Sequence, residues 1–580
     1  MATLLQVYRS LFPDESRRKA FESALRLPTD IFAFVGHVVE RSGAYHHVSP
    51  EVPDEADGDY RRIVVDDAMR NRAVDVGAQW RATPAEPGLR LPAPPPAVEA
   101  LWRSLEAFQD EPVFFPLEDD AEAPEWWGIC LELVMVSDEA SRDIGFEAAN
   151  PFFDFFMKEY TREDLSSGRS FRRIQRAPFS LSLAAEDLLC VQAKARTPSV
   201  GCTLRSLTHH LALLPPRGQV RARWVAPLIA PGPLAVDDGL GLLLVPFPYR
   251  IADDAFRPAG VDPSGHWGWF DVEQSWLPKN VNRGRRTGLV DYVLDLIASA
   301  RAGGARVDAV VLPELALNYI QFISLAAALA KDAKIDFLIA GISRDQSKRK
   351  GNFVAIAPFF LLGGNRNEEI TGWQGLVLIR EKHHRWKLDG SQIEAYNLTG
   401  LDSSKSWWEE LTILSRSLDL LVYRGNSTLT TLICEDLARV DPCQAVVRAV
   451  GPNLLIALLM DGPQLGERWP GRYATVLAED PGTSVLSFTS FGLIARQNDI
   501  GRFDQASSIA LWKDEKTGPK KLELHREADA LVLELKSVSK EERTLDGRTD
   551  GGSSLRWEYQ RHVQVIADVR PDWIQSGVGR

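Results

Sequence analysis

The chain contains several short segments that consist almost entirely of apolar and β-branched residues. Four of them are LGLLLVPFPY (240–249), AVVLPELAL (309–317), STLTTLI (427–433) and NLLIALLM (453–460). A strand without polar residues at alternate positions is buried on both faces, which is typical of sheets covered by helices. Stretches with helical spacing lie between these segments, at 287–302, 323–330 and 442–450, and after the last one, at 472–479. The alternation predicts an α/β fold for the C-terminal part of the chain.

The length and composition set the class of protein. A chain of 580 residues is longer than one hydrophobic core usually organises, so we expect at least two domains. The net charge of −12 disfavours a nucleic acid as partner. The five cysteines include no CxxC pair, which fits a reducing compartment and predicts neither disulfides nor a structural metal site. The sequence starts without the pattern of a signal peptide and has no membrane-length apolar run, so we expect a cytoplasmic protein.

The first 236 residues form the first predicted domain, a helix-rich region whose function the sequence does not indicate. Helical patterns cover 17–27 and Ile31–Glu40, and a third, TLRSLTHHLALLPP (203–216), carries His209 and His210. Adjacent histidines do not share a helix face, so this pair does not predict a metal site. The region contains no phosphate-binding loop and no polymerase signature.

Three residues with complementary chemistry follow predicted strands in the second domain, 237–580. Glu314 follows the strand that starts at 309, Lys382 follows LVLI (376–379), and Cys434 follows the strand 427–433. Alone, each has an ordinary explanation: a helix-capping acid, a solvated lysine and an inert buried thiol. Together they supply a base, a cation for a developing oxyanion and a nucleophile. Open α/β sheets place their ligands at the carboxyl ends of strands, so we expect these three residues to meet.

The motifs around these residues resemble those of the nitrilase, or carbon–nitrogen hydrolase, superfamily. LPEL (312–315), REKHH (380–384) and LICEDLAR (432–439) match its glutamate, lysine and cysteine motifs, and the Cys-Glu-Asp triplet is most similar to the glutaminase domains of glutamine-dependent NAD synthetases. The resemblance implies a four-layer α-β-β-α sandwich for 237–580, a homo-oligomer and no cofactor. It implies that Glu314 is the general base, that Cys434 forms a thioester, and that Lys382 and the backbone N–H of Glu435 stabilise the oxyanion. Glu394, twelve residues after Lys382, is where that branch often carries a supporting glutamate.

The resemblance favours a small amide as substrate, since nitrilases proper usually have tryptophan after the cysteine, where this chain has Glu435 and Asp436. One ambiguity concerns the lysine, because Lys387 follows the same strand; Lys382 is preferred because it lies closer to the strand end. A second hypothesis is a nitrilase-like scaffold for oligomerisation or ligand sensing in antiviral defence, similar to the nitrilase regions of defence-associated reverse transcriptases. A zinc hydrolase ranks last, because no HxxxH or paired Cys/His spacing occurs.

Overall fold

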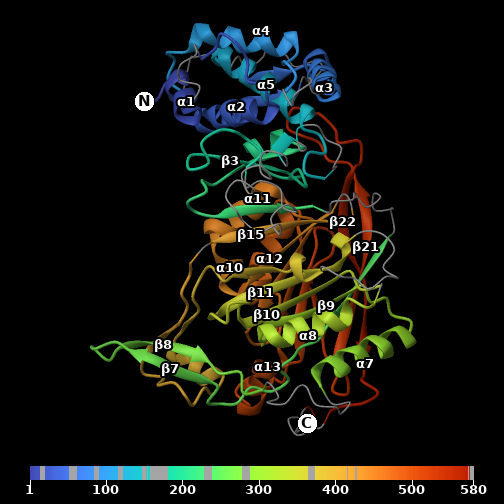
Figure 1. Ribbon diagram of the computed structural model, residues 1–580. Helices are drawn as coiled ribbons and strands as arrows, with labels where there is room; N and C mark the ends of the chain where they lie inside the picture. Colours follow the sequence, from blue (N-terminus) through green and yellow to red (C-terminus); the bar gives the residue numbers. More distant parts are fainter. Residues whose placement is uncertain are drawn as a thin grey trace.

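The computed structural model shows a helical N-terminal region stacked on a larger body of sheets and helices (Figure 1). It describes residues 1–13, 20–50, 62–83, 91–114, 122–146, 152, 155–156, 180–226, 238–276, 288–332, 334–362, 373–414, 416–424, 427–571 and 574. The predicted domain boundary between residues 236 and 237 lies outside these described residues.

The N-terminal region is built from five helices and a short parallel pair of strands within the described residues. The helices are α1 (Leu4–Leu11), α2 (Pro28–Ser42), α3 (Asp67–Ala82), α4 (Pro96–Ser104) and α5 (Glu125–Ala140), and the strands are β1 (Val48–Pro50) and β2 (Ile63–Val65). The predicted helix Ile31–Glu40 is confirmed as part of α2, whereas residues 20–27 of the predicted helix 17–27 form turns. Tyr8, Phe34 and Trp102 stack edge to face in the core of this region, with large apolar surfaces buried.

The segment 203–216 is not the helix that its pattern predicts. It forms a short 3-10 turn, Leu204–Leu207, and then the strand β4 (Leu211–Leu214), which pairs with β3 (Cys190–Ala193). The backbone N–H groups of His209, His210 and Leu211 donate to the carboxylate of Asp138 at 2.7–3.0 Å. A buried acid from α5 thus takes the donors that a helix would have used internally, and tertiary structure overrides the local pattern.

Two seven-stranded sheets form the larger body. The first large sheet has the order β12-β11-β10-β9-β6-β21-β22, and its strands are β6 (Gly239–Leu244), β9 (Ala309–Leu317), β10 (Phe337–Arg344), β11 (Lys350–Pro358), β12 (Leu378–Glu381), β21 (Ala530–Lys540) and β22 (Ser554–Val565). The second large sheet has the order β20-β19-β18-β17-β16-β15-β5, and its strands are β5 (Arg221–Val225), β15 (Ser417–Tyr423), β16 (Ser427–Ile433), β17 (Leu454–Leu459), β18 (Ser484–Thr489), β19 (Ser508–Lys513) and β20 (Lys520–Glu523).

The two large sheets contact each other, and helices contact both of them. Strand β9 packs against β17 and β18, and β11 packs against β16. Helices α7 (Leu289–Ala302) and α8 (Tyr319–Leu329) pack on the first large sheet, and α10 (Glu435–Ala438) and α12 (Trp469–Glu479) pack on the second. The mixed α/β fold that the apolar strands predict is therefore confirmed.

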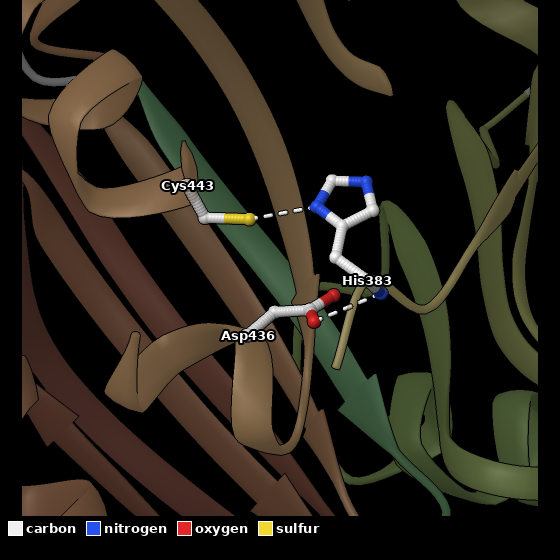
Figure 2. Close-up of side chains that lie close together, drawn as sticks. All are labelled: His383, Asp436 and Cys443. Atoms are coloured by element: carbon white, nitrogen blue, oxygen red, sulfur yellow. Dashed lines mark hydrogen bonds between the residues drawn. The ribbon is translucent and has the colours of Figure 1, made fainter. Parts of the chain in front are cut away.

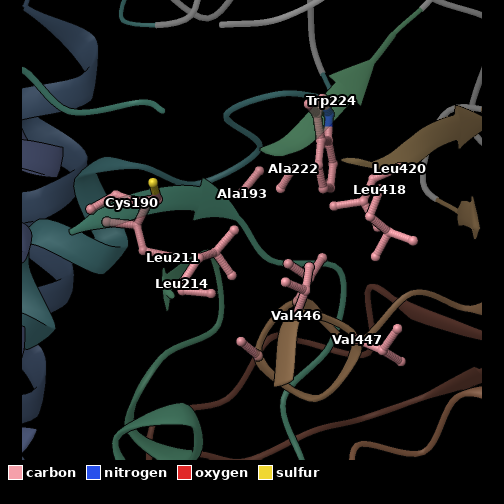
Figure 3. Packing of buried hydrophobic residues seen from close by; sticks show 14 of the residues in the cluster. Cys190, Ala193, Leu211, Leu214, Ala222, Trp224, Leu418, Leu420, Val446 and Val447 are labelled. Atoms are coloured by element: carbon pink, nitrogen blue, oxygen red, sulfur yellow. The ribbon is translucent and has the colours of Figure 1, made fainter. Parts of the chain in front are cut away.

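Strand β5 belongs to the second large sheet although it precedes residue 236. It pairs in parallel with β15, from Arg221 opposite Ser417 to Val225 opposite Leu421. Apolar side chains of β3, β4, β5, β15 and α11 (Ala445–Val450) converge beneath the N-terminal region, as Figure 3 shows. The N-terminal part of the chain and the large sheets consequently share one hydrophobic core.

A small four-stranded sheet stands beside the large ones (Figure 1). Its order is β13-β14-β8-β7, and its strands are β7 (Phe256–Val261), β8 (Trp267–Val272), β13 (Lys387–Leu388) and β14 (Ser406–Glu409). Trp407 of β14 is fully buried in the core of this part, with Phe256 and Phe270. None of the helices that the structure describes is both long and apolar enough to cross a lipid bilayer.

Candidate active site

Glu314 lies in an irregular part of β9 that brings its backbone close to β10. The register between the two strands shifts here, since Leu312 pairs with Ala340 but Leu317 pairs with Ile342. Gly341 faces this bulge, and a Cβ on it would lie 2.5 Å from the Cα of Glu314. Leu315 has a positive φ of 53°. The bulge re-aims the glutamate side chain relative to a regular strand, as bulges beside functional sites often do.

Lys382 extends from the end of β12 and lies between two carboxylates. Its Nζ donates to Oε1 of Glu314 at 2.9 Å and to Oε2 of Glu409 at 2.7 Å. All three side chains are buried. Lys387 lies instead in β13, where its Nζ is 5.6 Å from the ring centroid of Trp408. The lysine that contacts Glu314 is therefore Lys382 and not Lys387.

Asn352 connects the two glutamates. Its Nδ2 donates to Oε1 of Glu314 and to Oε1 of Glu409, both at 2.7 Å. Oε2 of Glu409 also accepts from the backbone N–H of Trp386 at 3.0 Å. Oε2 of Glu314 is buried and has no hydrogen-bond partner among the described residues. One oxygen of Glu314 is thus held in place while the other remains open to accept a proton.

Cys434 is the residue between β16 and α10, and its backbone is strained. Its φ of 43° and ψ of −109° are sparsely populated for a residue with a side chain. The backbone N–H donates to the carbonyl of Leu458 in β17 at 2.9 Å, and the carbonyl accepts from Leu437 at 2.9 Å. The side chain is only 2% exposed. Strained turns of this kind cluster at functional sites, where they orient a nucleophile at a strand end.

Burial and charge set the protonation of these groups. Burial raises the pKa of Glu314, although the ammonium of Lys382 opposes this shift. Burial alone would lower the pKa of Lys382, but the carboxylates of Glu314 and Glu409 outweigh it and hold that pKa well above its usual value. Burial, followed by the charge of Glu314, raises the pKa of the Cys434 thiol well above its usual value. The site therefore holds a neutral thiol, a lysine cation and a carboxylate of raised basicity.

Asp436 connects the turn that contains Cys434 to the segment that contains Lys382. Its Oδ1 accepts from the backbone N–H groups of His383 and His384 at 3.0 and 3.1 Å and from Nδ1 of His384 at 3.1 Å. Its Oδ2 accepts from Nη1 of Arg380 at 3.3 Å. Because Asp436 is two residues from Cys434 and its donors flank Lys382, these bonds fix the lysine relative to the cysteine. We call this set of hydrogen bonds the Asp436 clasp.

His383 and Cys443 lie close to Asp436, as Figure 2 shows. Nδ1 of His383 lies 2.9 Å from Sγ of Cys443, and its Nε2 lies 2.9 Å from the carbonyl oxygen of Ser417. Burial lowers the pKa of His383 to about 4, so its ring is neutral near pH 7. The potential ligand atoms of His383, Asp436 and Cys443 lie within 4.8 Å of one another. The Asp436 oxygens already accept several hydrogen bonds beside the cationic Arg380, so these groups fit a hydrogen-bonded brace better than a metal site.

The two other residues predicted for the site, Glu435 and Glu394, do not contact Lys382 through their carboxylates. Glu435 begins α10, and its carboxylate pairs with Arg439 at 2.7 Å. Glu394 lies in α9 (Gly390–Ala395), with 63% of its side chain exposed and Arg502 3.9 Å away. The second carboxylate on Lys382 is thus Glu409 rather than Glu394, which corrects that expectation. The segment SWWEE shows an acid at the end of a short aromatic strand, but it does not show which residues that strand pairs with.

Comparisons with known proteins point to one group of structures. No protein-family model and no curated protein sequence matches the chain. An amidase from Nesterenkonia sp. is 13% identical over 52% of this chain and 91% of its own, with a TM-score of 0.29. A glutamine-dependent NAD+ synthetase from Acinetobacter baumannii is 11% identical over 56% of this chain and 48% of its own, with a TM-score of 0.28. Nit3 of Saccharomyces cerevisiae, a nitrilase superfamily member, is 12% identical over 60% of this chain and 95% of its own, with a TM-score of 0.24.

The solved structures that this chain is similar to are therefore members of the nitrilase superfamily and NAD synthetases. The chain spans about half the length of the Acinetobacter synthetase.

Proposed function

We propose that the protein hydrolyses the carbon–nitrogen bond of a small carboxamide through a thioester on Cys434. The observation that carries the proposal is the position of Lys382 between Glu314 and Glu409, with one buried oxygen of Glu314 left unpartnered. A base with an open lone pair, a fixed cation and a strained thiol are the groups that acyl transfer requires. The four-layer order of the implied sandwich is part of the proposal, supported by the contacts between the large sheets and by their helices.

In the first step, Oε2 of Glu314 takes the proton of the Cys434 thiol as the sulfur attacks the carbonyl carbon. The carbonyl π electrons move to the oxygen, and the resulting oxyanion is stabilised by the ammonium of Lys382 and the backbone N–H of Glu435. This N–H is in the first turn of α10, where it has no carbonyl partner within the helix. Collapse of the intermediate breaks the carbon–nitrogen bond, and Glu314 returns the proton to the leaving nitrogen, which departs as ammonia.

In the second step, water replaces the departed ammonia. Glu314 removes a proton from the water as its oxygen attacks the thioester carbonyl, and the same two donors stabilise the second oxyanion. The carbon–sulfur bond then breaks, the thiolate takes the proton from Glu314, and a carboxylic acid leaves. Because the raised pKa of Glu314 lies closer to neutrality than that of a solvated glutamate, it suits a group that both accepts and returns a proton.

Thiol labelling and ammonia release test this proposal together. We expect iodoacetamide at pH 7 to modify Cys434 faster than Cys443, an equally buried thiol without a carboxylate base of this kind. Glu314→Gln should slow that modification by about 100-fold or more, the usual contribution of a general base. A panel of primary amides should release ammonia with the native protein and not with Cys434→Ala.

The contrary result is equally specific. If Cys434 reacts no faster than Cys443 and no amide releases ammonia, the hydrolase proposal is wrong. The hypothesis of a scaffold for oligomerisation or ligand sensing would then take its place.

A further inference from the structure

A second polar cluster lies beside the nucleophile and takes no part in the proposed proton transfers. Asp461 follows β17, the strand whose Leu458 carbonyl binds the backbone N–H of Cys434. Its Oδ1 accepts from the hydroxyl of Tyr396 at 2.7 Å and from Nη2 of Arg468 at 2.8 Å. Strands β16 and β17 are parallel neighbours, with Ile433 opposite Leu458, so Cys434 and Asp461 both follow the carboxyl ends of adjacent strands.

The other oxygen of Asp461 is an open hydrogen-bond acceptor. The side chain is only 7% exposed, and Oδ2 is buried without a partner among the residues that the structure describes. A buried carboxylate oxygen without a donor is costly, and native proteins keep few of them without a functional reason. Oδ2 of Asp461 and Oε2 of Glu314 are thus two unpartnered carboxylate oxygens, both on side chains whose charges act on the Cys434 thiol.

The surrounding residues hold Asp461 in one orientation. Its backbone N–H donates to Oγ1 of Thr489 at 3.0 Å, and its carbonyl accepts from the same hydroxyl at 2.8 Å. Gly462 is packed so tightly that a Cβ there would lie 2.5 Å from Nη1 of Arg468 and 2.7 Å from Oε1 of Gln497. With Oδ1 bound at the same time, the carboxylate has little freedom to turn Oδ2 toward a donor of its own.

We propose that Oδ2 of Asp461 binds an N–H donor on the acyl portion of the substrate, and that the preferred donor is an ammonium group. This inference rests on the proposed hydrolase function. The ion pairs at the ends of these strands comprise three carboxylates (Glu314, Glu409 and Asp461) and two cations (Lys382 and Arg468), so their summed charge is negative. A carboxylate-bearing substrate would be repelled, and an alkyl chain would leave Oδ2 unpartnered. The substrate class is therefore an amino-carboxamide.

Matched amides of equal length test the inference. The probes are ω-amino amides, alkyl amides and dicarboxylic acid monoamides with three to six carbons, assayed by ammonia release. We expect kcat/KM for the best ω-amino amide to exceed that for its alkyl isostere by about tenfold or more, since a hydrogen bond to a charged group is among the stronger ones. Asp461→Asn should remove most of this ratio. Asp499→Asn, the same change at an exposed position of α13 (Phe491–Ile500), should leave the ratio within about twofold.

A labelling experiment gives a readout that needs no turnover. A cationic aminoethyl methanethiosulfonate should modify Cys434 faster than its anionic sulfonatoethyl counterpart, and Asp461→Asn should reduce this preference by about tenfold. If alkyl amides are hydrolysed but neither ratio favours the cation, the inference is wrong and the proposed function stands. If no amide of any class is hydrolysed and Cys434 reacts no faster than Cys443, both are wrong.

Discussion

Lys382 pairs with both buried carboxylates of the candidate site. A buried ammonium without partners would lose its proton, and two carboxylates prevent this. Glu409 helps to keep Lys382 charged, and in the proposed mechanism it spares Glu314 from being the sole counter-ion. The side-chain amide nitrogen of Asn352 donates a hydrogen bond to each of the two carboxylates and so fixes their relative positions.

Comparing two glutamates tests this role. Glu409→Gln should lower kcat/KM by about 10- to 100-fold, because it removes a supporting group that touches a reacting group. Glu394→Gln should leave kcat/KM within about twofold, since that side chain is mostly exposed. Both variants are assayed by ammonia release from the best amide of the panel. Equal losses in the two variants would contradict the assignment of Glu409.

Sequence reasoning at this scale depends on where a residue stands relative to a strand. Glu314, Lys382 and Cys434 each follow a segment that is visibly apolar, so their positions at strand ends could be predicted. Glu409 ends β14, a short strand that pairs with β13 and, across more than a hundred residues of sequence, with β8. No local pattern encodes such a pairing, and the family spacing instead pointed to Glu394.

The Asp436 clasp determines how two elements of different sheets meet. Strand β12 belongs to the first large sheet and β16 to the second, so no strand pairing connects Lys382 with Cys434. The side chain of Asp436 makes this connection. Burial alone would raise the pKa of Asp436, but the cationic form of His383, the hydrogen bond from His384 and the charge of Arg380 lower that pKa to about 2. The folded state is therefore stabilised by keeping this carboxylate ionised.

At pH 7 the His383 ring is neutral, so the stabilisation comes from the hydrogen bonds that Asp436 accepts from Arg380, His383 and His384. Asp436→Asn should lower the free energy of unfolding at pH 7 by about 1.5–3 kcal/mol, the usual contribution of hydrogen bonds to a buried charged group. Because the folded pKa lies below the unfolded value of 3.8, this stabilisation is fully present above pH 3.8. It is lost as the pH falls from there through about 2, so the difference between the native protein and the variant should shrink over that range. Urea unfolding at several pH values measures it, with the exposed Asp441→Asn as control. A difference that persists below pH 2 would contradict ionisation as the cause.

Strands and helices could be predicted from the sequence where their burial in the fold agrees with the local pattern of apolar residues. The continuous apolar strands of the two large sheets were readable because both of their faces are buried. Strand β5, RARWV, was missed because its two arginines suggest an exposed segment. Arg223 is instead neutralised by Asp419 on the neighbouring strand, at 2.8 Å, and this partner lies almost two hundred residues away.

At the scale of the whole molecule, Arg548 joins the N-terminal region to the C-terminal strands. Its side chain is 1% exposed. It contacts Glu139 at 2.8 Å and Asp138 at 3.3 Å, both in α5, and Asp546 at 2.9 Å. It also donates to the backbone carbonyl of Leu207 at 2.7 Å. A buried cation shared between distant segments favours unfolding of the two regions as one unit.

Arg548→Met should lower the free energy of unfolding by about 3–5 kcal/mol, because it leaves buried acids without their cation. Chemical denaturation followed by tryptophan fluorescence measures this loss. Arg543→Met removes an arginine whose side chain is 65% exposed and should cost less than about 1 kcal/mol. Equal effects of the two changes would show that Arg548 does not join the regions.

The pairing of β5 with β15 bears on where the chain can be cut. A fragment that starts at residue 237 would lack β5. Strand β15 would then be an exposed apolar edge strand, which could pair with other copies of the fragment. Any shortened form intended to retain hydrolysis should therefore begin before Arg221, and preferably before Cys190, so that the β3–β4 hairpin still covers α11.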